Sequence, residues 1–273
     1  MKFKLSKTIL ILLIAFCLFV FVKSVSVNSE ILPYRDSPRD VVIQMFTKEA
    51  IASDIYNKTK TPDFTLYGNG KVIYTRYLPD QTCQLMEAKM SPKYIEFLLN
   101  FFEQEGFFDM NDNYLNLTIK DLPTTYITVN LRDKKRTITV YGLTLALKQR
   151  MLPKGLVNIH RKLNEFARED EKEYIPKKIS LYVHGVTPGM MPKDSIIVKW
   201  KVKKIDLRKY INKKDSLIIR YKQTILTGDD KKNIMNFLGR KTLYKNRYGF
   251  MDTFFKNHKR YFKVAYRPHL PYE

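Results

Sequence analysis

Hydrophobic and polar residues follow three different patterns along the chain. An unbroken apolar run, Thr8–Val22, comes first and is enclosed by Lys7 and Lys23. Residues 41–166 then mix strand-like alternation with helix-like spacing, and residues 179–266 show mainly strand-like alternation. This order predicts an α+β protein, with antiparallel sheets and helices on one face, preceded by one N-terminal transmembrane helix.

The apolar run has features of both a membrane anchor and a signal peptide. As a helix it would rise about 22 Å, short of a hydrocarbon layer of about 30 Å, but Lys7 and Lys23 can reach toward the headgroups. Cleavage after Ser26 is the alternative, which would give a secreted protein. Lipidation at Cys17 is a third interpretation, which the continuing apolar run disfavours. We expect residues 1–30 to be an uncleaved single-pass anchor in the cell membrane, with the rest of the chain outside the cytoplasm.

The first exported region, residues 38–170, predicts an α+β domain with two hairpins and two helices. The turn Gly68–Gly70 between two β-prone runs is a strong hairpin signal, with positive φ expected at Asn69 and Gly70. A helix is expected from the N-cap Ser91 to Gly106. The other predicted elements are a strand at Val41–Phe46, a second hairpin of Thr125–Leu131 with Arg136–Tyr141, and a helix from Pro153 through Phe166.

The second exported region, residues 176–273, predicts a basic and mostly β domain with one short helix. That helix is expected between Thr227 and Gly239, and the tail Arg267–Pro271 is expected to extend over this domain. The predicted strands are Ile179–His184, Ile197–Lys203, Leu217–Lys222, Thr242–Tyr248 and Tyr261–Tyr266.

The net charge of +22 is concentrated in the second region. Residues 31–175 contain 21 Lys and Arg against 19 Asp and Glu, whereas residues 176–273 contain 24 against 7. In Ile197–Lys203 the lysines alternate with apolar residues, so one face of the expected strand is cationic.

This cationic face has two interpretations. It is the solvated face of a sheet, or it is a surface that attracts polyanions. Partners of such a surface would be anionic lipid headgroups or envelope polymers, and export argues against nucleic acid as the natural partner. The candidate polyanion-binding residues are Lys199, Lys201, Lys203, Arg220, Lys222, Lys245, Arg247, Lys263 and Arg267.

The sequence carries no recognisable catalytic, cofactor or metal motif. The four histidines lie far apart, and no GxSxG, HExxH or CxxC occurs. Asp109–Asn113 begins like a calcium loop, but Tyr114 and Lys120 stand where glycine and glutamate are needed. His160 and Cys83 fit core positions.

We therefore expect no catalytic residue, cofactor or metal. The expected function is that of a membrane-anchored extracytoplasmic binding or structural protein that is not an enzyme. An exported hydrolase acting on cell-envelope material is the alternative, because a site can be assembled from residues far apart in sequence.

Three segments together resemble an uncharacterised domain family of bacterial lipoproteins and secreted proteins. They are the hairpin Phe64–Tyr74, the turn Gly106–Met110 and the strand Asp121–Val129. The likeness covers about half of the chain, and its motifs are structural turns. It departs at Thr59–Asp63, where the family has a cysteine-rich stretch. The resemblance implies a bacterial, exported α+β module of unknown function and supplies no catalytic residue.

Overall fold

The computed structural model describes residues 32–50, 54–79, 83–114, 119–191, 193, 195–210, 222–239 and 253–273. The predicted anchor Thr8–Val22, the predicted strand Thr242–Tyr248, and Arg220, Lys245 and Arg247 lie outside these residues. Within the described ranges, no helix is both long enough and apolar enough to cross a bilayer. Contacts separate residues 1–32 from a unit of residues 33–273, which contains both sheets.

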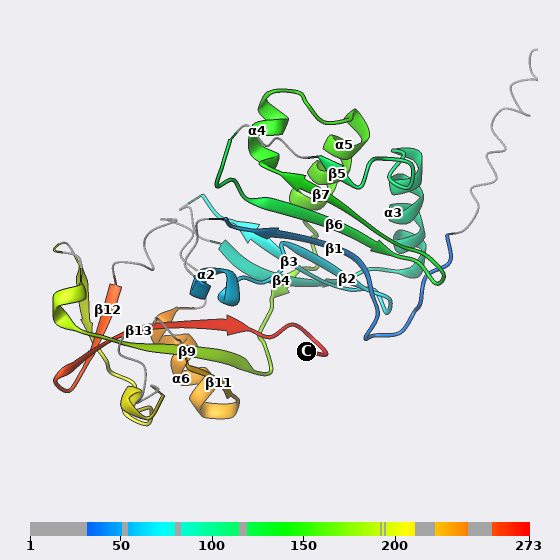
Figure 1. Cartoon of the computed structure of the whole chain (residues 1–273). Helices are drawn as coiled ribbons and strands as arrows, with labels where there is room; N and C mark the ends of the chain where they lie inside the picture. Colours follow the sequence, from blue (N-terminus) through cyan, green and yellow to red (C-terminus); the bar gives the residue numbers. More distant parts are fainter. Residues whose placement is uncertain are drawn as a thin grey trace, which may run out of the picture. The chain divides into compact units, whose positions relative to one another are not determined.

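The described residues form two sheets (Figure 1). The first has the order β5-β7-β6-β1-β2-β3-β4-β8, from β1 (Val41–Lys48), β2 (Phe64–Tyr67), β3 (Lys71–Tyr77), β4 (Cys83–Lys89), β5 (Asn113–Tyr114), β6 (Thr124–Asn130), β7 (Lys135–Tyr141) and β8 (Lys172–Glu173). The second has the order β10-β12-β13-β9-β11, from β9 (Ile179–Val186), β10 (Ile196–Lys199), β11 (Lys222–Leu226), β12 (Thr253–Asn257) and β13 (Arg260–Pro268).

Each sheet contains one parallel pair, β5 with β7 and β10 with β12, while the other pairs are antiparallel. The α+β class is confirmed, but the prediction of purely antiparallel sheets is corrected to mixed sheets. Alternation assigns each side chain to a face and does not give the direction of the neighbouring strand.

The helices are α2 (Asp54–Thr59), α3 (Pro92–Gln104), α4 (Leu143–Lys148), α5 (Lys154–Asn164) and α6 (Gly228–Leu238), with short 3₁₀ turns η1 (Pro188–Met190) and η2 (Leu207–Tyr210). The N-cap prediction for α3 is confirmed, because the Ser91 hydroxyl accepts a hydrogen bond from the Tyr94 N–H at 3.3 Å. Gly106 follows this helix with φ +75°, a left-handed conformation that glycine adopts without a Cβ clash.

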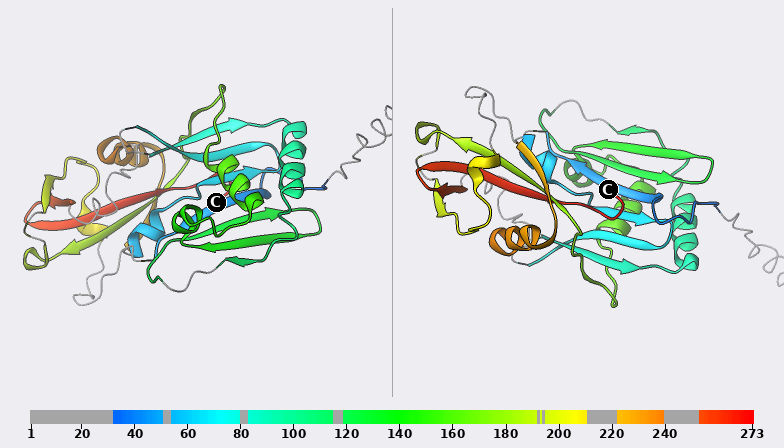
Figure 2. Two further views of the ribbon diagram at one scale, coloured as in Figure 1. Left: turned by 90° about the horizontal axis from the view of Figure 1, so that it is seen from above. Right: turned by 90° about the horizontal axis from the view of Figure 1, so that it is seen from below.

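The two faces of the first sheet are covered by different parts of the chain. The rings of Phe64 and Tyr74 contact Phe166, which follows α5, with centroid distances of 5.3 and 4.8 Å. Tyr67 and Ile73 have the opposite parity and pack with Leu270, near the C-terminus. Figures 1 and 2 show α4 and α5 together on one side of this sheet. The opposite face is therefore left for the C-terminal tail.

The first hairpin is confirmed, with a turn that differs from the expected one. Leu66 pairs with Val72, which leaves a three-residue loop, Gly68–Gly70, in place of a two-residue turn. Gly70 has φ +85°, but Asn69 does not share the positive φ that was expected. A type I turn followed by one left-handed residue fits this loop length. A Cβ on Gly70 would overlap the Met90 carbonyl oxygen, so close packing also requires glycine there.

Most of the other predicted elements are confirmed, with shifted ends. The second hairpin, the strand at Val41, the helix after Pro153 and the helix after Thr227 are all present. The strand predicted at Ile197–Lys203 ends at Lys199, because the chain turns where the Ile205 N–H donates to the Val202 carbonyl. The sequence analysis missed the strands β4, β5, β8 and β12 and the short helices α2 and α4. Of the predicted strand Leu217–Lys222, only Lys222 is among the described residues, and it begins β11.

One face of the second sheet forms an apolar core. Its side chains come from alternate positions of β9 and β13, with Val183 opposite Val264. Ile234 and Met235 of α6 pack against this face. The indole ring of Trp200 closes the core next to β12, with centroids 5.0 Å from Phe237 and 5.6 Å from Phe255. The other face carries Lys199, Lys256 and Lys263 together with the buried side chains of Tyr182, Phe254 and Ala265.

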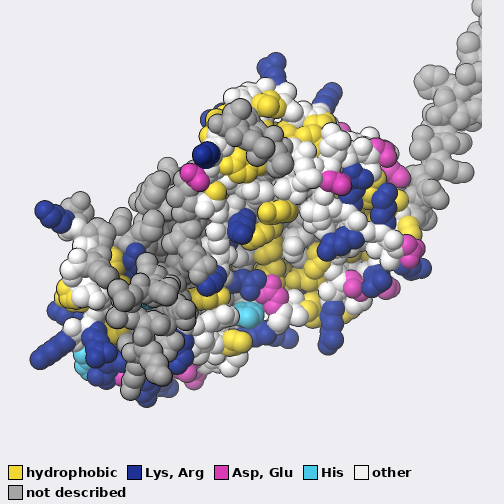
Figure 3. Space-filling view, viewed as in Figure 1, with side chains coloured by type: hydrophobic (Ala, Val, Ile, Leu, Met, Phe, Trp, Pro, Cys, Tyr) yellow, Lys and Arg dark blue, Asp and Glu magenta, His cyan; other side chains and the backbone are white. Residues whose placement is uncertain are grey.

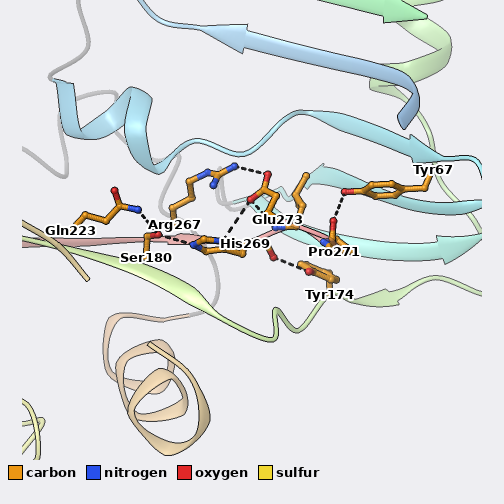
Figure 4. Close-up of polar contacts among 9 residues, drawn as sticks. Tyr67, Tyr174, Ser180, Gln223, Arg267, His269, Pro271 and Glu273 are labelled. Carbon is orange, nitrogen blue, oxygen red and sulfur yellow. Dashed lines mark hydrogen bonds and ion pairs between the residues drawn. The ribbon is translucent and has the colours of Figure 1, made fainter. Parts of the chain in front are cut away.

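The chain after β13 leaves the second sheet and packs on the first (Figure 4). The Tyr174 hydroxyl donates to the His269 carbonyl at 2.8 Å, and the Tyr67 hydroxyl donates to the Pro271 carbonyl at 3.1 Å. Burial, the largest cause, raises the pKa of both tyrosines, so the hydroxyls remain protonated donors. Leu270 is buried against Tyr67 and Ile73. The tail was predicted to lie over the second region, residues 176–273. That prediction is wrong for Leu270 and Pro271, which contact the first sheet instead.

Candidate anion-binding groove

Three of the predicted polyanion-binding residues interact with neighbouring groups. The ammonium group of Lys222 donates to a carbonyl oxygen in η2 at 3.3 Å. The ammonium of Lys263 lies 4.9 Å from the centroid of the Phe254 ring. The Arg267 guanidinium pairs with the Glu273 carboxylate at 2.8 Å. The contacts to oxygen engage Lys222 and Arg267, so these two are weaker candidates for a ligand, whereas the ring contact of Lys263 keeps its charge.

Lys199, Lys201 and Lys203 form the second group and are all exposed. Trp200 and Val202, between them in sequence, are each 8% exposed. The predicted alternation of buried and exposed positions is therefore present, although only the first of the three lysines lies in a strand.

The structure adds Lys256, a cation that the sequence analysis missed. β10 runs parallel to β12, and Lys199 is in register with Lys256. Lys256 is opposite Tyr261 on β13, and its ammonium lies 5.6 Å from the centroid of that ring, a contact that keeps its charge. The two lysines and Lys263 therefore lie on the same face of the sheet. The missed signal was the symmetry of Thr253–Phe262, in which aromatic pairs flank a polar turn as in a hairpin.

An open groove of about 850 Å³ lies beside these strands. Ile197, Trp200, Val202 and Ile205 provide its apolar lining. The indole N–H of Trp200 donates to the Ile205 carbonyl at 2.7 Å, which fixes the ring in place. The basic groups that line the groove are Lys199, Lys203, Lys256 and His258. Figure 3 shows Lys and Arg side chains gathered around this sheet, at the lower left.

One carboxylate also lines the groove, and it is occupied by other groups. Both oxygens of Asp206 accept hydrogen bonds from the Arg208 guanidinium, at 2.6 to 3.0 Å. The Asn257 amide donates to the same carboxylate at 3.3 Å. The hydrogen bond from Arg208 is the largest cause that lowers the pKa of Asp206 to about 2. Asp206 is therefore ionised and is a poor general base.

A serine and a histidine lie close together elsewhere on the second sheet (Figure 4). The Ser180 hydroxyl is 2.7 Å from His269 Nε2, and His269 Nδ1 is 3.9 Å from a Glu273 carboxylate oxygen. The Gln223 amide donates to the same hydroxyl at 2.9 Å. Burial, the largest cause, lowers the pKa of His269. The order of the groups resembles that of a hydrolase triad.

The burial of Ser180 argues against a catalytic role for this arrangement, because a substrate cannot reach the hydroxyl. Ser180 is 0% exposed and lies inside β9, which pairs with β11 on one side and β13 on the other. The histidine and the carboxylate both belong to the tail that covers the site, so opening the tail would remove the base from the serine. The contacts instead fasten the tail.

Cys83 and His160 are the remaining candidates from the sequence analysis. Cys83 is buried, as expected. His160 is partly buried, and its pKa is lowered chiefly by burial. Among the described residues, no group of three His, Cys, Asp or Glu side chains is arranged to hold a metal ion.

Comparison with known proteins gives one match. No curated protein and no solved structure matches the chain. The motifs at Phe64–Tyr74, Gly106–Met110 and Asp121–Val129 all lie inside the segment that does match a family. Residues 56–167 match the family described as Domain of unknown function (DUF6438).

Proposed function

We propose that this chain is an exported, membrane-held protein that is not an enzyme and that binds an anionic polymer in the groove beside Trp200. The site lies in the region that holds 24 Lys and Arg against 7 Asp and Glu. The apolar run Thr8–Val22 is the basis for export and for attachment to the membrane.

The register of Lys199 with Lys256 is the observation that carries this proposal. Like charges directly opposite each other on neighbouring strands destabilise a sheet. Within the part of the chain that the structure describes, no carboxylate pairs with Lys199, Lys203 or Lys256. An anion placed between them would remove the repulsion and gain from all three charges.

The site favours a chain-like ligand. The lysines line a groove whose lining includes an aromatic ring, and this lining begins at Ile197, far along the chain from the apolar run Thr8–Val22. A polymer with repeated phosphate or carboxylate groups can follow it and contact several cations in succession. Anionic polymers of the cell envelope have this chemistry, and they are accessible to an exported protein.

Calorimetric titration of the purified chain with long-chain polyphosphate tests the proposal. We expect saturable binding that weakens as sodium chloride rises, and no binding of neutral dextran. The variant K199Q/K203Q/K256Q should bind about 100-fold more weakly, at about five-fold per lysine. The variant K93Q/K120Q/K154Q, which loses the same charge from exposed positions, is the matched control. Equal weakening in both variants would mean that only the net charge matters.

A hydrolase built on Ser180 is the second candidate, because its hydroxyl lies 2.7 Å from the His269 ring nitrogen. A fluorophosphonate probe reacts with accessible, activated serines. We expect no labelling of the chain, because Ser180 is fully buried. Labelling that disappears in Ser180→Ala would support the hydrolase and contradict the binding protein.

A further inference from the structure

A second basic groove, of about 410 Å³, lies where the chain enters the first sheet. Its lining contains five cationic residues and two acids, Asp40 and Asp133, so its net charge is +3. Residues 31–175 carry a net charge of only +2 in total, so this groove holds a local excess that the remainder of the region lacks. The cations that line it, all exposed, are Arg35, Arg39, Arg132, Lys134 and Lys135.

The groove is formed by two segments that backbone contacts hold together. The Arg132 N–H donates to the Pro33 carbonyl at 2.8 Å, so the turn between β6 and β7 lies against the segment before β1. The Gly68 N–H donates to the Asp40 carbonyl at 2.8 Å. A Cβ on Gly68 would overlap the Arg35 carbonyl oxygen, so the segment depends on glycine there. Figures 1 and 2 show this segment, in dark blue, beside the end of β6 and β7.

The charges of this groove are largely available to a ligand. Within the described residues, no ion pair involves Arg35, Arg39, Arg132 or Lys135. The ammonium of Lys134 lies 5.1 Å from the Phe108 ring centroid, a contact that keeps its charge. Three of the five cations are arginines, whose planar guanidinium groups bind phosphate oxygens in pairs.

The position of the groove in the chain indicates the ligand. Pro33 follows the last residue of the apolar run, Val22, by eleven residues. A fully extended linker of this length spans at most about 40 Å. We infer that this groove is a membrane-contact site that binds the phosphate groups of anionic phospholipids beside the anchor. The inference rests on the part of the proposed function that holds the chain in a membrane, and it is independent of the groove at Trp200.

Hydrogen–deuterium exchange of the full chain in lipid nanodiscs tests this inference. The discs contain either phosphatidylcholine alone or an equal mixture with phosphatidylglycerol. We expect the amides of residues 131–135 to exchange more slowly in the anionic discs only. In R132Q/K134Q/K135Q this protection should be lost, at about five-fold per residue neutralised. K199Q/K203Q/K256Q is the control and should keep it.

The possible outcomes separate the two proposals. Equal exchange of residues 131–135 in neutral and anionic discs overturns the membrane-contact site, as does protection that survives R132Q/K134Q/K135Q. A chain that fails to co-elute with either kind of disc shows that the anchor is wrong, and the inference fails with it. Loss of polyphosphate binding at Trp200 changes neither the co-elution nor the protection.

Discussion

The two sheets follow the same alternation of buried and exposed positions but pair different side chains across their strands. In the first sheet, Thr128 is opposite Thr137, and their hydroxyl oxygens lie 2.9 Å apart, so each satisfies the other. In the second sheet, Lys199 is opposite Lys256, and the two repel. The threonine pair is complete within the protein, whereas the lysine pair gains from an added anion. The two sheets thus share the alternation and differ in the chemistry of the exposed row, and this difference is the basis of the proposed binding site.

The largest effect on stability is expected in the first sheet, from the substitution Gly70→Ala in the turn between β2 and β3. Gly70 has positive φ, and an added Cβ would overlap the Met90 carbonyl oxygen. We expect the free energy of unfolding to fall by about 3 kcal/mol, from backbone strain and overpacking together. Gly106→Ala is the control, because Gly106 also has positive φ but no atom lies within 4 Å of its added Cβ. It should cost about 1 kcal/mol. Urea denaturation measures both, and equal losses would contradict the packing argument.

A smaller effect on the free energy of unfolding is expected from pH. It comes from two histidines whose pKa values are lowered by burial. His160 lies in α5, and His269 lies in the tail, where Glu273 raises its pKa while Lys178 and Arg267 lower it further. The unfolded chain then binds protons more readily than the folded one, so stability is complete above about pH 6.5 and falls as pH drops below it. His269→Asn should reduce the slope, which urea midpoints measured on either side of that pH will show. Stability that rises on acidification would contradict the assignment.

The smallest effects should have opposite signs in the two sheets. Lys199→Gln relieves a repulsion and should raise the free energy of unfolding by about 0.5 kcal/mol at low salt. Thr128→Ala removes half of a satisfied pair and should lower it by about 0.5 to 1 kcal/mol. Sodium chloride should cancel the first change and leave the second. A loss of stability in Lys199→Gln at low salt would show that the lysine pair does not repel.

The sequence predicted the elements of the first region well because their signals are local. Ser91 caps α3 by its own hydroxyl, and Gly70 supplies the left-handed residue of the hairpin. The parallel pairing of β10 with β12 was missed because the two strands are separated by more than fifty residues. The contact of the tail with Tyr67 was missed for the same reason, since it spans 204 residues.

The candidate groove was predicted only in part. Alternation identified Lys199 and Lys203, because both belong to one alternating segment of the sequence, although β10 ends at Lys199. Lys256 and His258 join them through pairing between strands, which periodicity does not encode. Lys222 was selected because it shares a face of a predicted strand with Arg220, and Arg267 because it follows a predicted strand. Partners that the periodicity does not reveal engage both.

The fluorescence of Trp200 tests the central claim most directly. It is the only tryptophan in the chain, and it lines the groove between Lys199 and Lys203. Titration with polyphosphate should change its emission saturably in the natural chain and in K93Q/K120Q/K154Q, but not in K199Q/K203Q/K256Q. If polyphosphate binds by calorimetry while the emission of Trp200 stays constant, the polymer binds elsewhere and the groove is not the site.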